Sequence, residues 1–172
     1  MEKRGFTVWF TGLSGAGKTT LSNLVHHALQ EYGITNVEVL DGEVVRKQLS
    51  KGLGFSKEDV DTHIRRIGWV AQLLAKHGVP NLVAAVSPYR EARGEVRREV
   101  EHAAGKGSFV EVFVDCPAQV CASRGAPQFT GLDASYEPPH APEVRVRTDR
   151  ASAAEGAAMI LEHLKKSGLV SF

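Results

Sequence analysis

The residues best suited to chemistry lie in a glycine-rich segment near the amino end, TGLSGAGKTT at residues 11–20. Gly12, four further residues and then Gly17-Lys18-Thr19 have the spacing of a phosphate-binding loop between a strand and a helix. Such a loop turns backbone N–H groups toward phosphate oxygens, while its lysine supplies a positive charge and its hydroxyl faces Mg²⁺. A plain glycine-rich turn is the alternative, but every required position is filled. The segment predicts binding of ATP with Mg²⁺ by Gly12, Ser14, Gly15, Ala16, Gly17, Lys18, Thr19 and Thr20.

Two carboxylates form a second candidate group, because Asp41 and Glu43 directly follow the apolar run VEVL at 37–40. A carboxylate at the end of a strand, facing the phosphate loop, can orient Mg²⁺ or accept a proton from a hydroxyl acceptor. Asp-Gly is also a common turn pair, and the residues alone leave both interpretations open. An NTPase usually has an aspartate after the neighbouring strand, whereas the run NLVAAV at 81–86 is followed by Ser87.

These groups must be held by the elements around them, and the apolar pattern alternates between strand-like and helix-like segments. Strands are expected at 6–10, 37–40, 81–86, 109–114 and 143–148. Helices are expected at 18–32, 43–50 and from Ser56 to about Gly78, then from Ser87-Pro88, after Pro117, and from Ser152 to about Gly168. The pattern predicts one α/β domain over 1–172, a P-loop NTPase-like three-layer fold with a mostly parallel five-stranded sheet and helices on both faces.

Composition narrows the classes of partner. The chain has 172 residues and a formal net charge of +1, so no large basic field favours nucleic acid. No apolar stretch reaches the roughly 20 residues that cross a membrane, and the amino end shows no signal sequence. Cys116 and Cys121 are expected to be free, buried thiols. We therefore expect a cytoplasmic protein without nucleic-acid or membrane partners.

Eight short segments, in the order in which they occur, make the chain similar to adenylylsulfate kinases from about Phe6 to Thr148. They are GLSGAGKTT, LDGEVVR, LGFSKEDV, IRRIGWVA, SPYREAR, EVFVDCP, FTGLD and YEPP. The resemblance implies a P-loop kinase that transfers the γ-phosphate of ATP to the ribose 3′-hydroxyl of adenosine 5′-phosphosulfate (APS) in sulfate assimilation. It also implies Mg²⁺ as cofactor and a homodimer.

The same resemblance implies roles for individual residues. Lys18 and the paired carboxylates Asp41 and Glu43 would be catalytic, with one carboxylate acting on Mg²⁺ and the acceptor hydroxyl. Ser87 would be a phosphorylated or substrate-contacting position, and Arg124 would pack on the ATP base. Acceptor contacts would come from Asp41, Arg46, Phe55, His63, Ser87 and Phe129, with Arg46 on the phosphosulfate and the two aromatic rings on either side of the adenine. Without the resemblance, Phe55 and Phe129 would be interpreted as aromatic residues that anchor loops, Ser87 as a helix N-cap and Arg46 as a solvated helix residue.

Departures from the family pattern concentrate on the acceptor side. Glu43 replaces an aspartate, Val60 replaces an acceptor-contacting arginine, and His63 replaces an asparagine. Between Arg124 and the FTG motif the family carries a basic lid of the form DxKGLYxKAR, where this chain has four residues, 125–128. Three hypotheses follow: an APS kinase impaired by the missing lid, a kinase for another small hydroxyl acceptor, and a nucleotide-binding regulator with little turnover.

Overall fold

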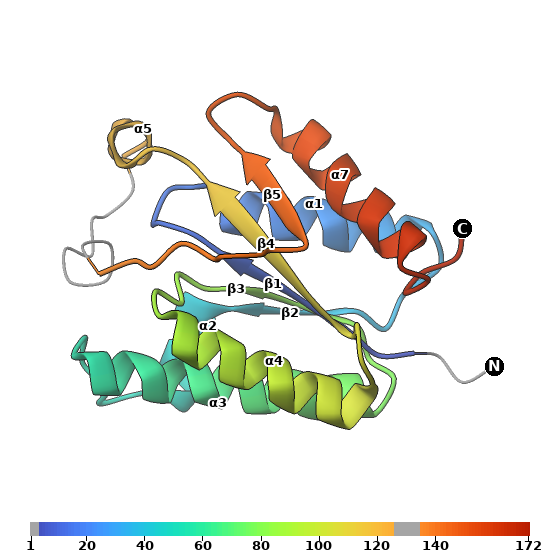
Figure 1. Cartoon of the computed structure of the whole chain (residues 1–172), viewed down its shortest axis with the longest axis horizontal. Coiled ribbons are helices and arrows are strands. Elements are labelled where there is room, and N and C mark those ends of the chain that lie inside the picture. Colours follow the sequence, from blue (N-terminus) through green and yellow to red (C-terminus); the bar gives the residue numbers. More distant parts are fainter. Residues whose placement is uncertain (1–3, 126–134) are drawn as a thin grey trace.

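A computed structural model describes residues 4–125 and 135–172 of the chain and shows one sheet between two layers of helices (Figure 1). All neighbouring strands are parallel, in the order β2-β3-β1-β4-β5. Among the helices of the described residues, none combines the length and apolar character needed to cross a bilayer. The strands are β1 (Thr7–Thr11), β2 (Glu38–Asp41), β3 (Asn81–Ala84), β4 (Phe109–Asp115) and β5 (Val144–Arg147).

The two faces of the sheet are covered by different helices, as Figure 1 shows for α1 and α7 on one side and α3 and α4 on the other. Alternate residues of β1 serve the two layers: Val8 and Phe10 join the core under α1 and α7, and Trp9 joins the core under α3 and α4. The helices are α1 (Lys18–Glu31), α2 (Gly42–Leu49), α3 (Lys57–Lys76), α4 (Arg90–Ala104), α5 (Ala118–Ser123) and α7 (Ala153–Lys166).

The sheet order decides where the site can form. β3 lies between β2 and β1, with Ala84 paired to Asp41 on one side and to Phe10 on the other. The carboxyl ends of the three parallel strands therefore meet at one edge, from which the phosphate loop, α2 and the segment after β3 all leave.

Most of the expected elements are confirmed. The fold class is the predicted one, Ser56 and Ser152 cap α3 and α7 with their side chains, and β5 is an edge strand. Cys116 and Cys121 are free and buried.

One helix start was predicted wrongly. α4 begins at Arg90 with Tyr89 as its N-cap residue, not at Ser87-Pro88. Ser87 adopts a left-handed backbone conformation with φ 45°, which a helix cannot contain. Residues 85–89 are instead an irregular segment that borders the site.

Candidate active site

The phosphate loop depends on glycine at two positions for different physical reasons. A Cβ atom at Gly12 would lie 2.3 Å from the backbone oxygen of Val114 on β4, so a side chain there would push β1 and β4 apart. Gly17 is the N-cap residue of α1 with φ 108°, a conformation that other residues rarely adopt. The loop can therefore curl onto the start of α1, whose first N–H groups face the phosphate position.

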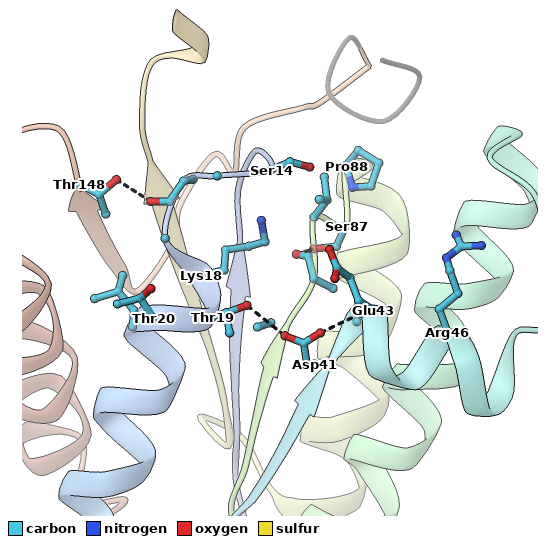
Figure 2. Close-up of a pocket in the computed structure, with 18 of the residues that line it drawn as sticks. Ser14, Lys18, Thr19, Thr20, Asp41, Glu43, Arg46, Ser87, Pro88 and Thr148 are labelled. Atoms are coloured by element: carbon cyan, nitrogen blue, oxygen red, sulfur yellow. Dashed lines mark hydrogen bonds between the residues drawn. The ribbon is translucent and has the colours of Figure 1, made fainter. Parts of the chain in front are cut away.

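Lys18 lies on the inner side of this loop. Its Nζ donates hydrogen bonds to the carbonyl oxygens of Gly12 and Leu13, at 3.0 and 2.9 Å. Figure 2 shows the side chain between the loop that carries Ser14 and the segment that carries Ser87. The side chain thus occupies the position from which the lysine of a phosphate loop can reach β- and γ-phosphate oxygens.

Thr19 and Asp41 join the phosphate loop to the end of β2. The Thr19 hydroxyl donates to Asp41 Oδ2 at 3.0 Å, while Asp41 Oδ1 accepts from the backbone N–H groups of Glu43 and Val44 at 3.0 and 3.4 Å. Asp41 is therefore both the N-cap of α2 and a neighbour of the nucleotide site.

The same pair of oxygens fits Mg²⁺, which prefers oxygen ligands and usually combines one or two protein groups with substrate phosphates. Within the described part of the chain, no group of three or more His, Cys, Asp or Glu side chains could hold a metal by itself. The donor set of Thr19 and Asp41 is thus suited to a metal ion that arrives with the nucleotide.

The acceptor side is built mainly on α2 and the loop that follows it. Arg46 donates to the carbonyl of Leu53 at 3.0 Å, and its guanidinium lies 4.6 Å from the centre of the Phe55 ring. Phe55 is 50% exposed, in a loop that Arg46 holds against α2. Arg46 and Phe55 therefore form one unit at the mouth of the site.

His63, on α3, connects the two ends of α2. Its Nδ1 lies 2.7 Å from the Ser50 hydroxyl and its Nε2 lies 3.1 Å from the carbonyl oxygen of Gly42, so the neutral ring donates from Nε2 and accepts at Nδ1. Burial lowers the pKa of His63, and the charge of Arg46 lowers it further. The replacement of the family's asparagine has thus placed a neutral, fully bonded ring under the helix that carries Glu43.

Replacing His63 with asparagine is expected to flatten the pH dependence of stability. Because burial holds the pKa of His63 in the folded chain below its usual value, the unfolded chain takes up this proton first as the pH falls, and stability is lost on acidification. Urea unfolding between about pH 5.5 and 7.5 should give a smaller slope for His63→Asn than for the unmodified chain. His102→Asn, at an exposed position of α4, controls for the loss of one histidine, and equal slopes in all three proteins would contradict the expectation.

Ser87 lines the cavity, and its hydroxyl is hydrogen-bonded inside the protein. The residue is 2% exposed, its Oγ donates to the carbonyl of Ala85 at 3.0 Å, and the Trp9 indole Nε1 donates to that Oγ at 2.9 Å. Both hydrogen bonds run into the protein interior. The side chain that the family resemblance associates with phosphorylation is engaged there.

Arg124 and Thr148 brace the phosphate loop at the donor end. Arg124 donates to the carbonyl of Gly15 at 3.1 Å and to that of Thr148 at 2.8 Å, and the Thr148 hydroxyl donates to the carbonyl of Ala16 at 2.6 Å. Thr148 was missed in the sequence. Its signal is its position directly after β5, at the same edge of the sheet as Thr11 and Asp41.

One cavity of about 940 Å³ joins the donor and acceptor sides. Gly12 lies outside its lining, and Phe129 lies outside the described residues. The remaining expected site residues all line it: Ser14, Gly15, Ala16, Gly17, Lys18, Thr19, Thr20, Asp41, Glu43, Arg46, Phe55, His63, Ser87 and Arg124. Val60, at the position of the family's acceptor-contacting arginine, also lines it, and so do Lys47, Ala151, Ser152 and Ala153, which were not expected as contacts.

Comparison with known proteins agrees with this geometry. An adenylyl-sulfate kinase of Synechococcus sp. (strain JA-2-3B'a(2-13)) is 51% identical over 182 aligned residues, covering 99% of this chain and 100% of the relative. The APS kinase of Mycobacterium tuberculosis, solved in complex with AMPPNP and APS, is 41% identical with a TM-score of 0.83, covering 94% of this chain and 98% of that one. A hexameric APS kinase from Thiobacillus denitrificans is 37% identical with a TM-score of 0.80, covering 99% of this chain and 31% of that one.

The match with the family as a whole extends over most of the chain. The model of the adenylylsulphate kinase family matches residues 4–147, which span every strand of the sheet and every expected site residue. The chain therefore belongs to the adenylylsulfate kinase family.

Proposed function

We propose that this chain transfers the γ-phosphate of ATP to the ribose 3′-hydroxyl of APS. The observation that carries the proposal is the continuous cavity, which is lined by the phosphate loop, by Asp41 and Glu43, and by an acceptor wall made of Arg46, Phe55 and residues 85–88. A relative solved with AMPPNP and APS supports both substrates. The enzyme is then a phosphotransferase that acts on a hydroxyl group.

The two carboxylates are assigned different tasks. Asp41 already accepts from Thr19 and from two backbone N–H groups, so it orients Thr19 and the metal ligands. Glu43 is in the first turn of α2 and lines the cavity. It takes the proton of the 3′-hydroxyl while the hydroxyl oxygen bonds to the γ-phosphorus and the bond between that phosphorus and the β-phosphate oxygen breaks. Mg²⁺, when bound, would neutralise charge on the β- and γ-phosphates.

Lys18 supplies the fixed positive charge of the donor side. Its ammonium group, held over the loop by the Gly12 and Leu13 carbonyls, can move to the β- and γ-phosphate oxygens with little change of the backbone. Arg124 and Thr148 hold the loop in shape and place the base of ATP near Ala151–Ala153. Binding and orientation thus account for most of the catalysis, as is usual for phosphoryl transfer.

The acceptor wall is assigned to Arg46, Phe55 and the segment around Ser87, and the family resemblance adds Phe129, which lies outside the described residues. Arg46 binds the phosphosulfate, the aromatic rings hold the adenine, and Ser87 contributes its position and backbone. The two interior hydrogen bonds of the Ser87 hydroxyl favour this shaping role over phosphorylation.

A second candidate, a kinase for another small hydroxyl acceptor, rests on the altered wall. Val60 is 3% exposed and lines the cavity where the family pattern has an arginine, and His63 is bonded to α2. The alignment of 182 residues with the Synechococcus relative is longer than this chain of 172, so the relative has residues that this chain lacks. A shortened lid admits more water and a wider range of acceptors.

An activity assay of the purified chain with Mg-ATP and APS distinguishes these functions. The expected result is equimolar ADP and 3′-phosphorylated APS, separated by ion-exchange chromatography. ADP release that requires some other hydroxyl compound would select the second candidate. Saturable ATP binding with neither product would leave a nucleotide-binding regulator and overturn the proposal.

We also propose that the chain is cytoplasmic and forms a homodimer. The oligomeric state is open to direct measurement by light scattering, and the hexameric relative from Thiobacillus denitrificans gives a specific alternative mass.

A further inference from the structure

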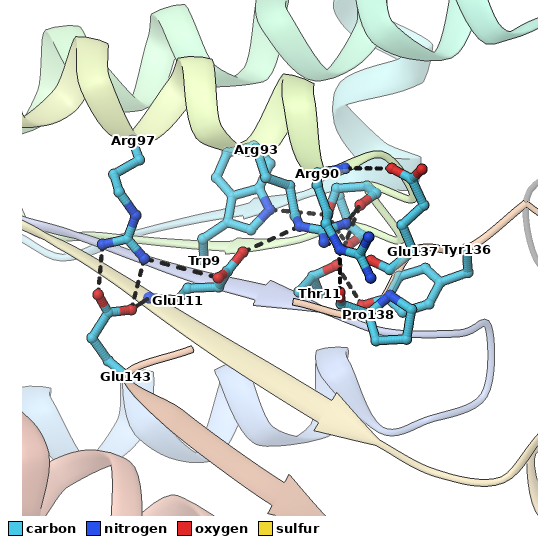
Figure 3. A network of polar contacts seen from close by, with 12 residues as sticks. Trp9, Thr11, Arg90, Arg93, Arg97, Glu111, Tyr136, Glu137, Pro138 and Glu143 are labelled. Atoms are coloured by element: carbon cyan, nitrogen blue, oxygen red, sulfur yellow. Dashed lines mark hydrogen bonds and ion pairs between the residues drawn. The ribbon is translucent and has the colours of Figure 1, made fainter. Parts of the chain in front are cut away.

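The motif YEPP, at residues 136–139, has no role in the function described above, yet its first residues contact the acceptor wall directly (Figure 3). The backbone N–H of Glu137 donates to the carbonyl of Pro88 at 2.8 Å. Its side-chain Oε1 accepts from the backbone N–H of Arg90 at 2.9 Å, and the Arg90 side chain donates to the carbonyl of Pro138 at 2.6 Å. Three hydrogen bonds thus fasten this distant segment to residues 88–90.

The contact with Arg90 explains how α4 begins. Tyr89, the N-cap residue, makes no capping hydrogen bond with its own side chain. The carboxylate of Glu137 satisfies one of the first N–H groups in its place, and a negative charge at this end of a helix is favourable.

Arg93 completes the attachment from inside the protein. This residue is 2% exposed and donates to the carbonyl oxygens of Ser87 and Glu137, both at 2.6 Å. Its Nε donates to Glu111 Oε2 on β4 at 3.1 Å. One buried guanidinium therefore binds the acceptor wall, the YEPP segment and the sheet together.

The wall needs such support because Ser87 has φ 45°, an unfavourable conformation for a residue with a side chain. Its carbonyl is held by Arg93 and its hydroxyl by Trp9 and Ala85. Tyr136 adds a link to the donor side, because its hydroxyl lies 2.9 Å from Thr11 Oγ1, and Thr11 in turn donates to the carbonyl of Val86 at 2.7 Å.

We propose that Glu137 and Arg93 are positioning residues that fix the Ser87-Pro88 wall against the bound acceptor, an inference that rests on the function proposed above. Neither side chain lines the cavity. Their effect passes through the backbone of residues 87–90, which sets the distance between the acceptor and the carboxylates of Asp41 and Glu43. Displacements of about 1 Å at such a wall can cost on the order of a hundredfold in rate.

Glu137→Ala is expected to raise the KM for APS about tenfold while the KM for ATP stays within about twofold. Glu137→Gln keeps an oxygen acceptor for the Arg90 N–H and should restore most of the affinity. The matched control is Glu143→Ala. Glu143 accepts hydrogen bonds from Arg97, one turn after Arg93 on α4, and from the backbone N–H of Glu111, so it belongs to the neighbouring ion-pair network rather than to residues 87–90. If the substitutions only destabilised the protein, Glu137→Ala and Glu143→Ala would change the KM for APS to the same extent.

A second pair of variants tests the buried cation. Arg93→Lys keeps the charge, but its compact ammonium group cannot replace the planar guanidinium that reaches Ser87, Glu137 and Glu111 at once. It should therefore raise the KM for APS, whereas Arg97→Lys should not. Equal KM values for APS in Arg93→Lys and Arg97→Lys, or no rise in Glu137→Ala, would overturn the proposal.

Hydrogen–deuterium exchange separates a failure of this proposal from a failure of the proposed function. Amides of residues 85–92 should exchange faster in Glu137→Ala than in Glu143→Ala, whatever acceptor the enzyme uses. If the unmodified chain does not phosphorylate APS, the proposed function falls and the exchange result alone decides whether Glu137 positions residues 87–90. Unchanged exchange in this segment would overturn the positioning role even in an enzyme that is active with APS.

Discussion

Lys18→Met is expected to lower kcat/KM for phosphoryl transfer by about a thousandfold or more, because it removes the fixed positive charge from the γ-phosphate position. Methionine retains most of the volume of the lysine stem, so the loop around Gly12 and Leu13 loses two hydrogen bonds from Nζ and little packing. Initial rates of ADP release with varied Mg-ATP and a fixed, saturating acceptor give the comparison.

The matched control for this substitution is Lys76→Met, at the exposed last position of α3 and away from the cavity. Its activity should equal that of the unmodified chain. If Lys18→Met retained activity within about tenfold of that control, the phosphate loop could not be the donor site, and the transfer chemistry would have to lie elsewhere.

Asp41→Asn is expected to give the second largest effect, a loss of about a hundredfold or more in kcat together with a higher Mg²⁺ requirement. Asparagine caps helices about as well as aspartate, so the N–H groups of Glu43 and Val44 keep their acceptor. The substitution therefore removes the negative charge beside Thr19 and leaves α2 in place. Rates measured over a range of Mg²⁺ concentrations at saturating ATP report the change.

Asp41→Ala separates the two tasks of this carboxylate. It removes the cap as well as the charge, so it should lose the same activity and also about 1 kcal/mol of stability. Thermal unfolding should therefore distinguish the alanine variant from the asparagine variant, while their activities are similar. Asp41→Asn with unchanged Mg²⁺ dependence would show that this carboxylate does not act on the metal.

The phosphate loop and the layered sheet could be predicted because their signals are local. Gly12 and Gly17 have fixed spacing around Lys18, and a buried parallel strand is recognisable as a continuous apolar run. The position of Asp41 was left open by the residues alone, and the strand order of the structure brings it to the loop, since the ends of parallel strands share one edge of the sheet.

The start of α4 could not be predicted because its cap is not local. Ser87-Pro88 has the residue types of a helix start, but Arg93 and Glu137 hold the carbonyls of Ser87 and Pro88 instead. A contact between residues 90 and 137 has no signature in either segment alone. Thr148 was missed for the same reason, since its partner Ala16 is distant in the sequence.

The acceptor side followed from the family resemblance and not from residue chemistry. Arg46 on its own reads as a surface arginine of α2, and its hydrogen bond to Leu53 and its place over Phe55 become visible in three dimensions. His63 likewise gave no signal for its two contacts with Ser50 and Gly42. Tertiary contacts of this kind decide which of several ordinary roles a side chain takes.

The first N–H group of α4 is capped by Glu137, a residue far along the chain, and this has a consequence for biosynthesis. When α4 leaves the ribosome, the residue that will satisfy its first N–H group has not yet emerged, and that turn can only fray in water. The residues that border the acceptor side can reach their final shape only after residue 137 has emerged, when four of the five strands are already outside the ribosome. The donor side is completed later still, because Thr148, whose hydroxyl donates to the Ala16 carbonyl of the phosphate loop, follows residue 137 in the chain.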